Sequence, residues 1–188
     1  MEEQSIYNLA GFDLGPAITA WLDDIIKGGG VGRTLLEHAI ANTHPGDDLF
    51  YSATFLMGNV APDAADPEAT PEVLLIYAVL TIHQNSIPKE TPGLWHGFEG
   101  YVRDAFERVQ AMGRTSAAEA LLRPMIQNST APNQDLQWMR RAANPDPAKY
   151  ADHERHMASI WERNVRAAKI LDPAVDLDDL LLREISGD

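Results

Sequence analysis

Residues 74–86 read LLIYAVLTIHQNS, and this stretch limits what the chain can fold into more than any other. Its apolar residues fall on nearly every side of a helix, so most of the helix surface is expected to be buried. Thr70, Pro71 and Glu72 precede it and supply a hydroxyl cap, a proline at the first helical position and an acid in the first turn. We therefore predict a central helix over residues 71–84, with the other helices packed around it.

The rest of the chain also has helical periodicity, with no convincing strand pattern and no internal repeat. We predict an all-α fold, a helical bundle of eight or nine helices without a sheet. Pro124 is expected to give the helix around it a kink or a late start. The loop at residues 85–94 is the predicted boundary between an acidic N-terminal lobe (1–90) and a C-terminal lobe with a basic face (91–188), packed as one compact unit. The other predicted helices cover residues 16–27, 31–42, a short stretch through Phe50 and Phe55, and then 98–112, 116–127, 132–143, 147–170 and 171–185.

The net charge of −13 argues against a general nucleic-acid binder. The charge is unevenly distributed, however. Residues 1–99 hold three basic and fourteen acidic side chains, whereas residues 103–169 hold eleven basic and eight acidic ones. A basic face in the second half is therefore compatible with an acidic protein.

The composition also restricts the compartment. The chain has no cysteine, which excludes disulfides and thiolate metal sites. No apolar run reaches transmembrane length, and the first thirteen residues lack the layout of a signal peptide. We expect a cytoplasmic protein with no membrane contact.

Catalytic and metal-binding patterns are weak. His153 and His156 are three residues apart, whereas the zinc-protease helix needs histidines four apart. The aspartates between residues 172 and 179 lack the glycine and distal glutamate of a calcium loop, so capping is the preferred interpretation. The glycines at 28–32 could cradle a phosphate, but no strand precedes them and a turn is favoured. We predict no enzyme, no metal site and no cofactor.

Two sets of polar residues are candidates for binding. His83 and Gln84 end the central helix, where we expect them to satisfy backbone carbonyls and join the lobes, with a ligand contact as the alternative. On the helix 147–170, Arg155, Arg166 and Lys169 point within about 60° of one another at 100° per residue, and Arg163 lies beside them. Trp138 points away from the inner face of its helix, and either stacks on a single-stranded base or packs against a partner.

Five motifs follow one another in an order that resembles a known family. They are RTLLEHA at 33–39, the apolar helix ending HQNS at 83–86, GFEGYVR at 97–103, the arginine, small polar loop and Leu-Arg helix of 122–141, and VDLDDL at 175–180. This order is similar to that of the CasB-type small subunit of Cascade, the RNA-guided surveillance complex of type I-E CRISPR systems. The family has His-Gln-Gln-Ser where this chain has Asn85 in the third position.

The resemblance implies a non-enzymatic helical subunit, present in more than one copy. It would pack on the backbone subunits that carry the crRNA and on the large subunit, and would hold the displaced single-stranded non-target DNA while the guide pairs with the target strand. It implies strand contacts at Arg33, Arg123, Arg140 and Arg141. Helical geometry adds Arg166 and Lys169, with Trp138 as a stacking platform.

Other function classes remain open. The Asp/Glu-rich first half fits an acidic protein-binding module that mimics DNA or inhibits a nucleic-acid-binding complex, because spaced carboxylates can occupy a basic groove. A helical enzyme is a third and weaker alternative, since no acid–base pair stands out. Salt-dependent binding of single-stranded DNA separates the first two.

Overall fold

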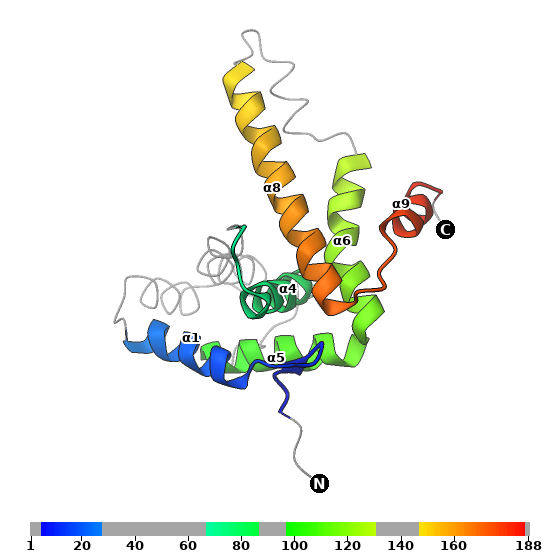
Figure 1. Ribbon diagram of the computed structural model, residues 1–188. Helices are drawn as coiled ribbons and strands as arrows, with labels where there is room; N and C mark the ends of the chain where they lie inside the picture. Colours follow the sequence, from blue (N-terminus) through cyan, green and yellow to red (C-terminus); the bar gives the residue numbers. More distant parts are fainter. Residues whose placement is uncertain (1–4, 28–66, 87–96, 131–146, 187–188) are drawn as a thin grey trace.

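The computed structural model describes residues 5–27, 67–86, 97–130 and 147–186. This part of the chain is mostly helical, as predicted (Figure 1). Three of the predicted helices, at 31–42, through Phe50 and Phe55, and at 132–143, lie outside the described residues. Within those residues the helices are α1 (Gly15–Lys27), α4 (Pro71–Ser86), α5 (Gly97–Met112), α6 (Arg114–Thr130), α8 (Pro147–Leu171) and α9 (Leu177–Ser186).

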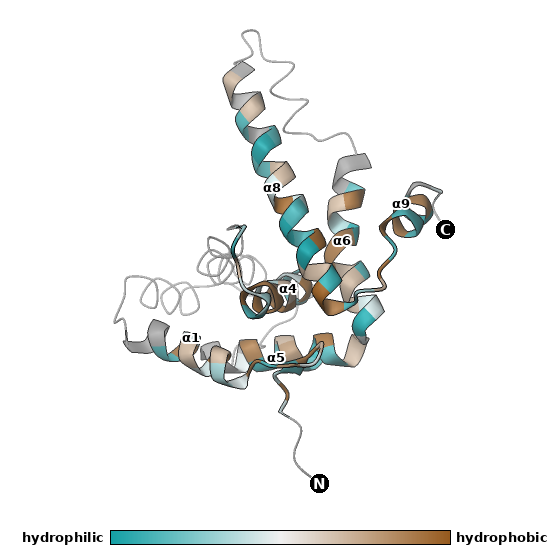
Figure 2. Cartoon of the chain, viewed as in Figure 1, coloured by the Kyte–Doolittle hydropathy of each residue, from teal (hydrophilic) through white to brown (hydrophobic). Residues whose placement is uncertain are grey.

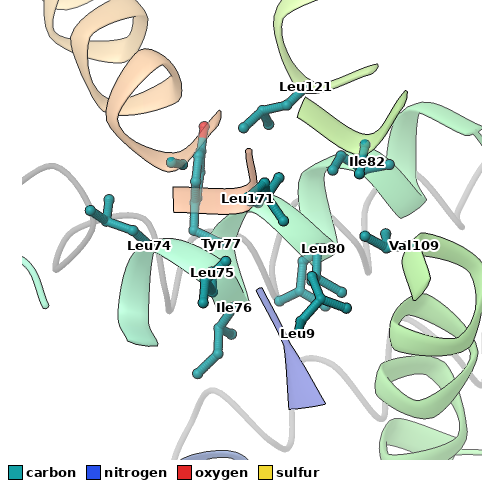
Figure 3. Close-up of a cluster of buried hydrophobic side chains, with 14 of the residues drawn as sticks. Leu9, Leu74, Leu75, Ile76, Tyr77, Leu80, Ile82, Val109, Leu121 and Leu171 are labelled. Carbon is teal, nitrogen blue, oxygen red and sulfur yellow. The ribbon is translucent and has the colours of Figure 1, made fainter. Parts of the chain in front are cut away.

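The centre of the fold is α4, which the sequence predicted correctly. Every residue from Leu74 to Leu80 is buried, and α4 packs against α5, α6 and α8 (Figure 3). The helix begins as expected, because the Thr70 hydroxyl accepts a hydrogen bond from the Val73 amide at 3.4 Å. It ends at Ser86 rather than at residue 84. Figure 2 shows apolar residues over α4 and polar residues along much of α8.

The neighbouring helices each contribute one apolar face to the same core. Phe106 is fully buried on α5, and Ala117 and Ala118 on α6 and Ala167 and Ala168 on α8 are at most 1% exposed. Side chains from before residue 87 and from after residue 96 therefore belong to one hydrophobic cluster. α6 begins at Arg114 and continues through Pro124, so a late start at this proline is wrong, while the alternative of a kink there stays a prediction. In Figure 1 the N-terminal half of α8 extends beyond the level of α4.

A small hairpin near the N-terminus corrects the prediction of a fold without strands. Strand β1 (Asn8–Leu9) pairs antiparallel with β2 (Phe12–Asp13). Two-residue strands are too short to produce an alternating pattern, so periodicity could not detect them. Ala10 and Gly11 form the turn and both have positive φ, of 52° and 85°. This is the backbone of a two-residue turn whose twist suits a hairpin.

The hairpin turn gives a stability prediction. Ala10 occupies the left-handed region, which costs an L-residue roughly 1–2 kcal/mol, whereas Asn tolerates it and Asn-Gly is the preferred pair in such turns. We expect Ala10→Asn to raise the free energy of unfolding by up to about 1 kcal/mol. Urea unfolding followed by circular dichroism measures the change. Ala10→Val is the matched control and should lower the midpoint, because a branched side chain disfavours positive φ; a fall for both variants would contradict the assignment of the turn.

Candidate functional site

Arg123 is the described arginine that the family resemblance marks as a DNA contact. It lies on α6, and its guanidinium binds acids on two helices. Nε lies 2.6 Å from Oε1 of Glu184 on α9, and Nη2 lies 3.5 Å from Oε2 of Glu119. Gln127 also donates to Glu184, at 2.9 Å. Arg123 is thus held by carboxylates of its own chain rather than presented alone.

A second arginine completes this group of charges, which we call the α6–α9 ion cluster (Glu119, Arg123, Asp179, Arg183 and Glu184). Arg183 lies 2.7 Å from Glu119 and 2.9 Å from Asp179. The hydrogen bond from Gln127, followed by the contact with Arg123, lowers the pKa of Glu184, and the hydrogen bond to Glu119 raises the pKa of Arg183. The cluster pairs two guanidinium groups with three carboxylates, so it carries no surplus positive charge for a phosphate.

The three basic residues in the C-terminal part of α8, Arg163, Arg166 and Lys169, do not form one outward face. Arg163 donates to the Tyr77 hydroxyl at 3.0 Å, and its guanidinium carbon lies 4.3 Å from the centre of the Tyr77 ring. Arg166 is half-buried and donates to the backbone oxygen of Ala69 at 3.2 Å. Lys169 is exposed. Arg163 therefore ties α8 to α4, and Arg166 ties it to Ala69, the residue before the Thr70 cap. Of the three, Lys169 is the one that is exposed to solvent.

His83 lies where α4 meets α5, and its side chain is only 1% exposed. Burial, followed by the charge of Arg108, lowers the pKa of His83 to about 4, so the imidazole is neutral at pH 7. His83 lines an open hollow of about 540 Å³ together with Asp104, Glu107, Arg108, Ala111 and Met112. Gln84 is half-buried beside it in sequence. Their predicted role in joining the lobes stays a prediction.

The remaining candidates lie outside the described residues. They are Arg33, Trp138, Arg140 and Arg141. Their contribution to a common surface with Lys169 is therefore still a sequence-based prediction.

Among the aspartates near the C-terminus, Asp176 caps α9, as the spacing predicted. Oδ1 of Asp176 accepts hydrogen bonds from the amides of Asp178 and Asp179, both at 3.0 Å, at the start of α9. Asp172 accepts from Thr115 and from the Ala174 amide. Within the described ranges, no three His, Asp or Glu side chains are grouped closely enough to hold a metal ion.

The sequence did not indicate the partners of the arginines. Arg163 and Tyr77 are 86 residues apart, and Arg183 and Glu119 are 64 apart, so no local spacing connects them. One signal was available for Arg163, because it follows the inward Ile160 by three residues and so lies near the inner face of α8. A cation close to the inner face of an amphipathic helix often reaches an aromatic ring below it.

Comparisons with protein-family models, with curated proteins and with solved structures gave no match to this chain. In the part of the chain that the structure describes, none of the helices combines the length and the apolar character needed to cross a bilayer.

Proposed function

We propose that this chain is a non-enzymatic small subunit of an RNA-guided surveillance complex of the Cascade type. The observation that carries the proposal is where the motifs lie on the helices. HQNS forms the last turn of the buried α4, GFEGYVR the first turns of α5, and VDLDDL leads into α9. The order of buried helix, polar end and following helix is the one that the resemblance implies.

In this proposal the subunit binds other Cascade subunits through its helical surfaces and supports the displaced non-target strand electrostatically. Lys169 and the arginines at 33, 140 and 141 would contact phosphates. Arg123 would contact a phosphate only by giving up its present contact with Glu184, whose Oε1 lies 2.6 Å from Nε. Holding the displaced strand favours R-loop formation, because pairing the guide with the target is a nearly balanced exchange.

A second candidate is an acidic inhibitor or DNA mimic that binds the basic groove of such a complex. The observation in its favour is that Arg123, Arg163 and Arg166 all bind groups of this chain, while the net charge is −13. Such a protein would bind a basic partner and exclude DNA from it.

Co-expression separates the two candidates. The tagged chain is produced with the other subunits of a Cascade and a guide RNA, and the purified assembly is weighed by native mass spectrometry and tested for R-loop formation. Incorporation into a complex that opens target DNA supports the small subunit. Incorporation into a complex that no longer binds DNA supports the inhibitor. Lack of association would overturn both.

The strand contact gives a more specific prediction. We expect Arg140→Ala/Arg141→Ala to shorten the lifetime of the R-loop and to weaken its salt dependence, with unchanged helicity, because each lost phosphate contact removes one released counterion. Single-molecule or filter-binding dissociation at several salt concentrations measures it. Arg114→Ala is the control, because this exposed arginine of α6 is not among the candidate strand contacts. Equal lifetimes for the double variant and the wild type would exclude these arginines as strand contacts.

A further inference from the structure

A second pocket has none of the described candidate DNA contacts in its lining. It is half-open, has a volume of about 150 Å³, and forms where the hairpin crosses the turn between α5 and α6. Its floor consists of four side chains that are at most 8% exposed: Leu9, Val109, Ala117 and Leu171. All four belong to the hydrophobic cluster around α4, and Leu9, Val109 and Leu171 are labelled in Figure 3. A cavity of this size holds a group as large as a benzene ring.

The rim of this pocket differs from its floor in chemistry. The polar residues of the lining are Asn8 and Gln110, which carry side-chain amides, and Arg114, which carries a guanidinium group. The described residues that line the pocket include this cation and no carboxylate, although the chain has 28 acidic residues and 15 basic ones. The rim is therefore suited to an anion in a protein that otherwise repels anions.

The first turn of α6 adds to this preference. The carbonyl of Gly113 accepts the hydrogen bond of the Ala117 amide at 3.0 Å, so Gly113 stands at the start of α6 and Arg114 belongs to its first turn. Amides in a first helical turn and the helix dipole both favour negative charge. The charge of Arg114 also acts on Asp172, but that carboxylate is held by Thr115 at 2.7 Å and by the Ala174 amide at 2.9 Å. A guanidinium has five donors, so Arg114 can serve a ligand and Asp172 together.

We propose that this pocket binds a small amphipathic monocarboxylate. Its apolar body would lie on the floor formed by Leu9, Val109, Ala117 and Leu171, and its carboxylate would lie at Arg114. The occupant is a free organic acid with an apolar part about the size of one ring. This site is separate from the proposed function and does not depend on it.

Benzoate is the probe, and benzyl alcohol is its neutral analogue. We expect saturable binding of benzoate to the full chain with a Kd on the order of 1 mM, and weaker binding of benzyl alcohol by about tenfold. Isothermal titration gives the affinities, and amide shifts at Gln110 and Gly113 in NMR spectra locate the site. Wild-type protein without saturable benzoate binding at about 20 mM would overturn the proposal.

Two variants make the test specific. Arg114→Gln removes the charge at an exposed position and should weaken benzoate about tenfold while leaving benzyl alcohol unchanged. Ala117→Val fills the floor and should weaken both ligands; its folding is checked by circular dichroism. Arg155→Gln, an exposed arginine on α8, is the matched control and should bind like the wild type. Binding that Arg114→Gln does not change would overturn the proposal.

Discussion

Phe106→Ala is expected to lower the free energy of unfolding by about 3–5 kcal/mol. Phe106 is fully buried on α5, and its ring meets the Tyr7 ring edge to face, with centroids 5.2 Å apart and an angle of 84° between the planes. The substitution removes the transfer free energy of the ring, leaves a cavity, and removes the aromatic pair that ties the N-terminal segment to the core. Urea unfolding followed by circular dichroism measures the loss.

Two comparisons make this result interpretable. Phe106→Leu keeps most of the volume and should cost distinctly less than Phe106→Ala. Leu182→Ala removes an exposed leucine of α9, 67% accessible, and should change stability by no more than about 0.5 kcal/mol. A similar loss at Phe106 and Leu182 would contradict the position of the core. A larger loss than expected would indicate that the hairpin detaches together with Tyr7.

The elements that the sequence predicted well are those whose signals are local. α4 is recognised from its apolar residues and from the Thr70 cap, and α8 from inward side chains such as Trp161 at helical spacing. The cap of α9 was also predictable, because Asp176 accepts hydrogen bonds from amides only two and three residues further along the chain. The hairpin was not predictable in the same way, because its strands have two residues each and one of its turn residues is an alanine.

The candidate site was less predictable than the fold. A helical wheel places Arg166 and Lys169 on one side of α8, but it cannot tell that Arg166 reaches the Ala69 carbonyl while Lys169 stays in solvent. The family resemblance marks Arg123 as a strand contact, whereas the structure places it against Glu184, 61 positions away in sequence. The availability of a charged side chain depends on helix packing, and the sequence does not contain that information in any local pattern.

His83 leads to a prediction about acid stability. In the folded protein its pKa is lowered to about 4, first by burial and then by Arg108, whereas in the unfolded chain it has its ordinary value of about 6.5. Between pH 6.5 and pH 4 the unfolded state therefore binds more protons, and the free energy of unfolding falls as the pH falls through this window. The difference between the two pKa values corresponds to a loss of at most about 3 kcal/mol, and above pH 7 this histidine costs nothing.

The contribution of His83 is isolated by comparing how steeply stability falls with pH in the wild type and in variants, because other groups also titrate in acid. His83→Gln keeps a neutral polar side chain at the end of α4 and should flatten the fall in stability between pH 6.5 and pH 4, whatever its effect on stability at pH 7. His156→Gln changes an exposed histidine of α8 and should leave the wild-type slope unchanged. Urea midpoints measured at half-unit steps of pH give the slopes. If His83→Gln falls as steeply as the wild type, His83 is not a buried neutral imidazole, and its position at the junction of α4 and α5 must be different.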